Sequence, residues 1–134
     1  MKKGRVTVAT QKDVHTHLIK NKWIEVEEWS DDLNLLYKST WSLPDDRSQV
    51  IWAVVNGVFF QLLSPFARTT ELSNERALNA NPTLFGMGKY WGHYCLVNLG
   101  IVSHFSAEEF ETMTEVIARH ADDIEKNSGG GDIL

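Results

Sequence analysis

Two histidines and the single cysteine of the chain lie close together in sequence and are the residues best suited to chemistry. His93 and Cys95 have the spacing of two that places both side chains on one face of a strand, and His104 follows nearby. With one further ligand this set could hold zinc, or Cys95 could act as a nucleophile. Cys95 lies in a largely apolar segment, 94–102, where a cysteine is usually a small, inert core residue. We therefore favour a structural role for Cys95.

Two further histidines lie on a predicted helix near the N-terminus. His15 and His17 are two residues apart, which on a helix turns their side chains about 200° away from each other. They cannot share a metal ion in the way that histidines four residues apart can. We expect both to be surface residues.

Adjacent aspartates occur at three places and would suit acid–base work or metal binding. Asp31–Asp32 and Asp45–Asp46 fall in predicted turns, where aspartate is favoured because its side chain bonds to nearby backbone N–H groups. A third group lies near the C-terminal end of a predicted helix and consists of Asp122, Asp123 and Glu125. These acids oppose the helix dipole, and Arg119 offsets them in part. We expect a surface charge cluster there, with an electrostatic partner site as the alternative.

The rest of the sequence contains no catalytic motif. Gly86-Met87-Gly88 is a lone G-x-G that lacks a third glycine and follows a predicted helix rather than a strand, so it is not a dinucleotide loop. A Walker loop, a G-x-S-x-G nucleophile elbow and an H-E-x-x-H metal motif are absent from the sequence. This pattern favours a binding module without cofactor or metal over an enzyme.

Composition narrows the classes of partner and the compartment. The 134 residues carry a net charge of -5, with eighteen acids against thirteen lysines and arginines, which argues against nucleic-acid binding. A single cysteine cannot form an internal disulfide, which suits the reducing cytoplasm, and we expect no signal peptide. The longest apolar run, Val50–Val55, is far shorter than the roughly 20 residues of a membrane span, so we expect no membrane contact.

Periodicity and turn residues predict a single α+β domain over residues 5–126, followed by a flexible glycine-rich C-terminal tail over 127–134. The predicted helices lie near 11–21, around 72–78 and after Ser106. The predicted strands cover 23–29, 33–41, 50–55, 58–63, 89–91 and 94–102. The order α-β-β-β-β-α-β-β-α predicts a twisted antiparallel sheet of five to six strands with three helices.

Particular residues set the predicted helix ends. Thr10 and Asp13 begin the first helix, and Thr69 or Thr70 caps the second, which ends before Pro82. Glycines at 86 and 88 loosen the chain before the next strand.

The last helix has the most complete set of local signals. Ser106 and Glu109 form a capping box, and Phe105 and Phe110 occupy the two positions of a hydrophobic staple. One apolar stripe follows the helical period and consists of Phe110, Met113, Ile117, Ala121 and Ile124.

One predicted hairpin is apolar on both faces. Its arms, 50–55 and 58–63, are joined by Asn56-Gly57, a strong signal for a two-residue turn. Such a turn places Val55 opposite Val58 and leaves Gln61 as the single polar residue of the two arms. The predicted pairs are Val55 with Val58, Ala53 with Phe60 and Ile51 with Leu62 on one face, and Val54 with Phe59, Trp52 with Gln61 and Val50 with Leu63 on the other.

A hairpin that is apolar on both sides needs cover on both sides, and the chain is too short for two helical layers. We therefore expect the first and last helices on one face and a second copy, or another protein, on the other. The residues expected at this protein-binding surface are Trp52, Val54, Phe59 and Leu63.

The chain resembles the type III secretion chaperone-like superfamily, and within it the YbjN-like bacterial proteins. The resemblance rests on five segments, 77–81, Leu84-Phe85-Gly86, 94–102, 103–110 and 121–124. It implies an α+β fold in which helices cover a twisted antiparallel sheet, frequent dimers, and action by protein binding or as a regulator, sensory transduction included. The predicted strand at 23–29 departs from this pattern.

From these observations we expect a cytoplasmic, non-enzymatic, chaperone-like or regulatory protein-binding module that works as a homodimer. One alternative is a small enzyme or ligand-binding protein with a pocket near His93, Cys95 and His104. Another is an inhibitor or immunity-type partner, whose acidic balance would suit a basic target.

Overall fold

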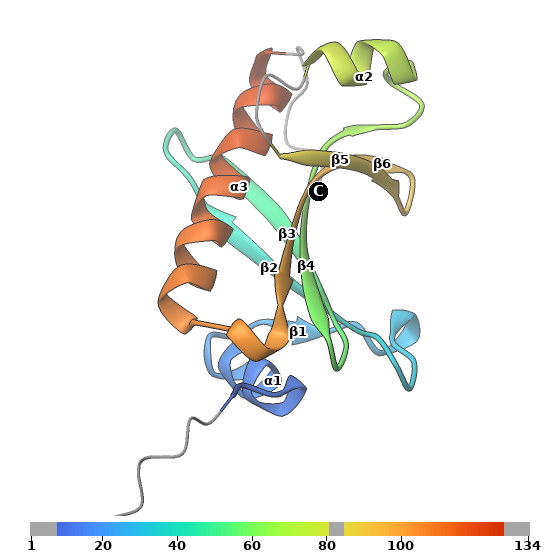
Figure 1. The fold of residues 1–134 in the computed structure, drawn as a ribbon. Helices are drawn as coiled ribbons and strands as arrows, with labels where there is room; N and C mark the ends of the chain where they lie inside the picture. The colour runs from blue at the N-terminus through green and yellow to red at the C-terminus, as the bar shows by residue number, and fades with distance from the viewer. Residues whose placement is uncertain (1–7, 81–84, 128–134) are drawn as a thin grey trace, which may run out of the picture.

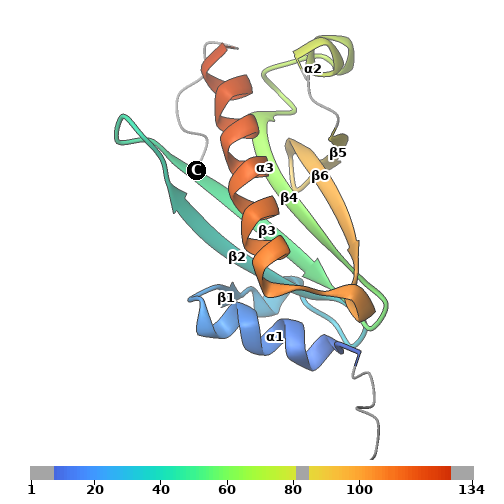
Figure 2. The same cartoon turned by 60° about the vertical axis from the view of Figure 1, so that its left-hand side comes forward.

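The computed structural model describes residues 8–80 and 85–127 and contains an open, six-stranded antiparallel sheet. Within these residues the order along the chain is α1, β1, β2, β3, β4, α2, β5, β6 and α3, and the order across the sheet is β1-β2-β3-β4-β6-β5. Helix α3 runs along one side of the sheet, while α1 and α2 lie near opposite ends of the molecule (Figures 1 and 2). The predicted α+β class and element order are confirmed. The predicted tail from 128 onward lies outside the described residues.

Helix α1, Gln11–Lys20, begins where the cap was predicted. The Asp13 N–H donates to the Thr10 hydroxyl oxygen, and the Thr10 N–H donates to the Asp13 carboxylate, so the two residues form a reciprocal capping box. Val14 and Leu18, one turn apart, are fully buried against the sheet. The alternation of buried and accessible positions therefore follows the helical period.

The predicted strand at 23–29 is largely wrong. Only β1, Ile24–Glu25, pairs with its neighbour, and a short 3-10 helix, η1, follows at Glu27–Trp29. The Ser30 side chain explains the early end, because its hydroxyl donates to the Val26 carbonyl and accepts the Leu36 N–H. Hydrogen bonds to the Ser30 hydroxyl thus take the place of backbone hydrogen bonds that would have continued the strand.

Strands β2, Leu35–Ser42, and β3, Ser48–Val55, form a hairpin in regular register from Leu35 opposite Val55 to Ser42 opposite Ser48. The turn between them contains Asp45 and Asp46 in the left-handed region, at φ 64° and 57°. The turn location predicted for this aspartate pair is confirmed.

The register predicted for the doubly apolar hairpin is wrong by two residues. Strand β4, Phe59–Arg68, pairs with β3 so that Val55 lies opposite Phe60, not Val58. The Asn56 side-chain oxygen accepts the N–H groups of Val58 and Phe59, which widens the loop, and Gly57 does not adopt the positive φ of a type I′ turn. Because the shift is an even number of residues, every side chain remains on its predicted face.

Strand β4 also continues past its predicted end near Ser64-Pro65. It reaches Arg68 by means of an irregularity between Pro65 and Ala67, which accommodates a residue that has no N–H for the ladder. Helix α2, Asn74–Ala80, therefore starts later than predicted, and the Ser73 hydroxyl, not Thr69 or Thr70, accepts an N–H of its first turn.

The two-residue turn occurs elsewhere, between β5, Gly86–Tyr90, and β6, His93–Ile101. Trp91 and Gly92 have φ 47° and 78°, as a type I′ hairpin requires. The predicted loop at Gly86 and Gly88 is wrong, since both lie in β5. A Cβ on Gly88 would lie 2.7 Å from the Tyr90 ring, so the ring covers this glycine at the sheet edge.

Helix α3, Ala107–Asn127, confirms the predicted helix and staple. The Glu109 N–H donates to the Ser106 hydroxyl, and the rings of Phe105 and Phe110 are 5.5 Å apart. Its predicted stripe is buried or half-buried against the sheet.

The sheet therefore has two unlike faces. The first face, which includes Ile51, Ala53 and Phe60, joins buried residues of all three described helices in one core. The second face has a smaller cluster of its own, made of Leu36, Val50, Trp52, Leu63 and Cys95.

Candidate functional site

Three tryptophans dominate the second face. Trp29 of η1 and Trp91 of the β5–β6 turn stack with ring centroids 5.0 Å apart and planes 3° apart. Trp52 of β3 lies beneath them, edge-on to Trp29 at 6.4 Å and to Trp91 at 5.0 Å. Trp52 is 3% exposed, whereas Trp29 and Trp91 are 46% and 39% exposed. We call Trp29 and Trp91 the tryptophan pair.

His93 supports this cluster from the first position of β6. Its ring lies 5.9 Å from that of Trp52, and its Nδ1–H donates to the Trp91 carbonyl oxygen at 2.9 Å. The histidine thus ties the β5–β6 turn to the face of the sheet. This is a packing role.

Around Trp52 the second face is closed to solvent, and Val26, Val54, Tyr90 and Val97 pack against its buried cluster. Trp52, Leu63 and Cys95 are between 0% and 3% exposed, and we call these three residues the closed half of the face. Burial raises the pKa of the Cys95 thiol to about 12, so the thiolate needed for nucleophilic attack is scarce near neutral pH. This supports the predicted structural role of Cys95.

The predicted cluster of His93, Cys95 and His104 does not assemble. His93 begins β6, while His104 lies in η2, Val102–His104, beyond the other end of that strand. The nine residues of β6 separate them by roughly 26 Å at the usual rise per residue. Among the described residues no group of three or more histidines, cysteines or carboxylates could hold a metal ion.

His104 instead lines a shallow cavity of about 220 Å³ beside the N-terminal end of α3. This cavity includes Gly100, Phe105 and Glu109 and lies on the first face, whereas Cys95 belongs to the second. Cys95 and His104 therefore lie on opposite faces of the sheet, and His93 and His104 lie at opposite ends of β6.

Beyond the closed half, the second face carries an uncharged and mainly apolar strip that is open to solvent. Phe59 pairs with Ile101, and Gln61 pairs with Leu99, across β4 and β6. Phe59, Leu99 and Ile101 are 36%, 58% and 50% exposed. Together with the half-buried neighbours, the open strip consists of Val54, Phe59, Gln61, Val97, Leu99 and Ile101.

The four predicted protein-binding residues divide between these two parts. Val54 and Phe59 belong to the open strip, while Trp52 and Leu63 are covered by the chain itself. Leu99 and Ile101 were not among the predicted residues, although the period of two along the strand 94–102 places them on the same face as Cys95 and Val97. What the sequence did not show was that β6 pairs with β4.

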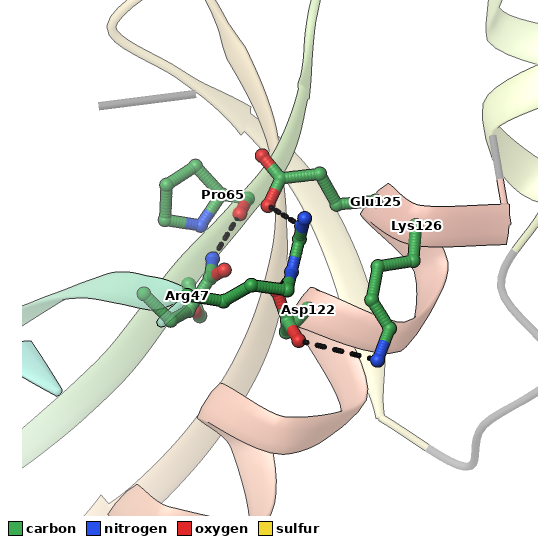
Figure 3. A network of polar contacts seen from close by, with 7 residues as sticks. Arg47, Pro65, Asp122, Glu125 and Lys126 are labelled. Carbon is green, nitrogen blue, oxygen red and sulfur yellow. Dashed lines mark hydrogen bonds and ion pairs between the residues drawn. The ribbon is translucent and has the colours of Figure 1, made fainter. Parts of the chain in front are cut away.

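The acidic group near the end of α3 is a structural centre (Figure 3). Asp122 and Glu125 are 5% and 1% exposed, and Arg47 from the β2–β3 turn pairs with both, at 2.7 Å from Asp122 Oδ1 and 3.2 Å from Glu125 Oε1. Arg119, the predicted compensating charge, pairs with Glu115 instead. The predicted surface cluster is therefore wrong for two of its three acids, because the β2–β3 turn brings an arginine to them.

The prediction of two surface histidines is also wrong. His15 is half-buried, with its Nδ1 2.6 Å from the Tyr37 hydroxyl, and His17 lies 3.5 Å from Glu111 and against the rings of Phe105 and Phe110. Both residues connect α1 to the elements that it packs on.

Comparisons with models of protein families, with curated proteins and with solved structures found no match to this chain. Within the described residues no helix is both long and apolar enough to cross a membrane.

Proposed function

We propose that this chain is a non-catalytic, chaperone-like or regulatory protein-binding module of the cytoplasm, which acts as a homodimer through the open strip. The observation that supports this proposal most is the difference in solvent exposure between the two faces of the sheet. Helices cover the first, whereas the second ends in a strip where Phe59, Leu99 and Ile101 meet solvent side by side. Contiguous exposed apolar side chains are typical of protein contact sites.

The composition of the strip supports a second copy as its occupant. In a two-fold symmetric dimer the same patch meets itself, so any charge within it would face a like charge. The strip contains no ionisable side chain although the chain carries a net charge of -5. Self-contact therefore buries apolar surface without charge repulsion at the centre.

The exposed aromatic ring of the strip supports the same proposal. Phe59 of β4 pairs with Ile101 of β6, and the next residue on the same face of β4, Gln61, pairs with the half-buried Val54 of β3. Aromatic side chains surrounded by smaller apolar residues are the usual energetic centres of protein interfaces.

The alternative of an enzyme with a pocket near His93, Cys95 and His104 is less well supported. Its thiol is buried with a raised pKa, and its second histidine lies past the far end of β6. A catalytic role would need these groups to converge.

The mass in solution tests the proposal. We expect the wild-type chain, of 15.2 kDa, to sediment at twice that mass at high concentration and to dissociate on dilution. Leu99→Glu should sediment as a monomer, because self-contact would then bury two carboxylates against each other. Since Leu99 is 58% exposed, its melting temperature should remain close to that of the wild type.

Leu78→Glu is the matched control. Leu78 is 62% exposed but lies on α2, away from the strip, so this variant should keep the wild-type mass. A wild-type chain that stays monomeric at every concentration would contradict the homodimer, as would a Leu99→Glu variant that remains dimeric. If the chain is a monomer that binds a different protein through the strip, the proposed binding module stands, but its partner is that protein and not a second copy.

A further inference from the structure

The indole ring of Trp29 has one face covered by another ring. Trp91 stacks on that face with ring centroids 5.0 Å apart and planes 3° apart. Trp52 lies 5.0 Å from Trp91 but 6.4 Å from Trp29, so this third ring is on the Trp91 side of Trp29. Among the described residues no further aromatic ring contacts Trp29, which is 46% exposed. The ring face turned away from Trp91 is therefore the part of this side chain that a partner can reach.

Exposed carboxylates lie on both sides of Trp29 in the chain. Residues 23–37 contain five acids and neither a lysine nor an arginine. Within the described part of the chain, the four acids closest to Trp29 in sequence form no ion pair. These four exposed residues, which we call the acidic segment, are Glu27, Glu28, Asp31 and Asp32. Negative charge without a bound cation is thus concentrated beside an accessible indole ring.

The local structure holds the ring and the charges together. The two glutamates belong to the same 3-10 helix as Trp29, and the Trp29 N–H donates to the Val26 carbonyl. Asp31 Oδ1 accepts the N–H groups of Asn34 and Leu33, each at 2.8 Å, and these bonds lower the pKa of the Asp31 carboxyl. The acidic segment is therefore ionised at neutral pH and has a defined place next to the ring.

A tryptophan face beside carboxylates suits one kind of cation best. Tryptophan is the strongest aromatic site for a cation, and arginine is the commonest cation found on it. A planar guanidinium can stack on the ring and still donate two parallel hydrogen bonds to a carboxylate. A lysine ammonium is a point charge and does not combine these contacts in the same way. An acidic partner would be repelled by the acidic segment.

We infer that the tryptophan pair and the acidic segment form a second protein-binding site, whose occupant is a basic, arginine-containing segment of another protein. The negative charge of this surface is complementary to such a segment, and the accessible face of Trp29 accepts a guanidinium. Trp91 supports the ring from behind. The site shares no residue with the open strip, so the inference goes beyond the proposed homodimer and does not depend on it.

The test measures binding of synthetic peptides to the folded protein by the fluorescence anisotropy of a label on the peptide. The probe is a short peptide of alternating arginine and glycine, compared with the same peptide containing lysine or glutamate in place of arginine. We expect the arginine peptide to bind most tightly, the lysine peptide more weakly and the glutamate peptide not at all. Binding should weaken as salt is added, because the contact is exposed.

Two substitutions remove the parts of the site separately. Trp29→Leu should weaken binding of the arginine peptide about threefold, the effect of losing one exposed cation–π contact. Glu28→Gln should weaken it by about twofold, as expected for an exposed ion pair. Glu28 is exposed, so Glu28→Gln should retain the wild-type melting temperature and stays informative if Trp29→Leu is unstable.

Two control variants separate a specific site from general attraction. Glu108→Gln changes the net charge by the same amount, but Glu108 is an exposed residue of α3, so this variant should bind the arginine peptide as the wild type does. Lys38 is exposed and lies opposite Trp52 on the face that contains Leu36. Because this lysine repels a basic segment, Lys38→Gln should bind at least as tightly as the wild type.

Four results would overturn the inference. They are absence of binding of the arginine peptide, unchanged affinity in Glu28→Gln, an equal loss of affinity in Glu108→Gln, and weaker binding by Lys38→Gln. The titrations are repeated in the Leu99→Glu background. A failure of the homodimer then appears in the sedimentation data alone, whereas a failure of the second site appears in the peptide titrations.

Discussion

The Nε atom of Arg47 lies 2.7 Å from Oδ1 of Asp122, although the two residues are 75 positions apart in the chain. This bond, with the second one to Glu125, attaches the β2–β3 turn to the last turns of α3. The two carboxylates are almost fully buried, so their ion pairs with this arginine offset part of the cost of removing both charges from water.

Arg47→Met should lower the free energy of unfolding by about 3 kcal/mol, because it leaves two buried carboxylates without their main cation. Urea denaturation at neutral pH measures this change. Arg119→Met is the control, since its ion pair with Glu115 is exposed on both sides and is worth at most about 1 kcal/mol. Equal effects of the two substitutions would show that the Arg47 bonds contribute no more than a surface pair.

Gly100→Ala should destabilise the fold by about 1 to 3 kcal/mol, because the new methyl group must displace a packed aromatic ring. A Cβ at this position would lie 2.2 Å from the Phe60 ring, which belongs to the first-face core. Gly57→Ala meets nothing within 4 Å and should leave the melting temperature unchanged or slightly higher. A neutral Gly100→Ala would mean that the Phe60 ring has room to move.

Stability should fall as the pH rises above 9.0, the ordinary pKa of a thiol, towards about 12, the pKa of buried Cys95. In this window the unfolded thiol loses its proton while the folded one keeps it, so unfolding is favoured by up to about 1.4 kcal/mol per pH unit. Burial and, to a lesser extent, Glu25 also raise the pKa of Tyr37 to about 12, which acts in the same direction. Denaturation of Cys95→Ala across this range should give a shallower decline, and an identical decline would exclude the thiol as a contributor.

Asn56→Ala should cost about 1 to 2 kcal/mol, because the N–H groups of Val58 and Phe59 lose their shared acceptor. Asn56→Asp keeps that acceptor and loses only the bond from Asn56 Nδ2 to Asn34 Oδ1, so it should retain most of the stability. Thermal unfolding compares the three proteins. If both variants lost the same stability, the loop would not depend on the side-chain oxygen.

Local signals predicted those elements whose stability is largely local. The caps at Thr10 and Ser106, the Phe105–Phe110 staple and the stripe of α3 all involve residues within about one turn of each other, so sequence spacing contains their geometry. The division of the β3 and β4 side chains between two faces was predictable for the same reason, because alternation along a strand is a local property.

Two kinds of feature were not predicted, those set by a competing side-chain hydrogen bond and those set by a distant residue. The hairpin register changed because the Asn56 side chain bonds to the loop, and the strand at 23–29 ended early because Ser30 replaces the ladder. The acids of α3 became buried because Arg47 reaches them from another turn. The first two outcomes depend on side-chain hydrogen bonds between near neighbours that compete with the expected backbone pairing. The third depends on an arginine 75 positions from Asp122, and residue spacing contains no information about such a contact.

On the second face of the sheet, one property was determined by the sequence alone and another by the tertiary structure. Its apolar character follows from the sequence alone, since alternate residues of 50–55, 58–63 and 94–102 are mostly apolar. Which residues stay accessible was decided by the tertiary structure, because Trp29 and Trp91 fold over Trp52 while the pairing of β4 with β6 places Phe59 beside Leu99 and Ile101. Burial of a side chain depends on all the elements around it, and these come together only in the folded sheet.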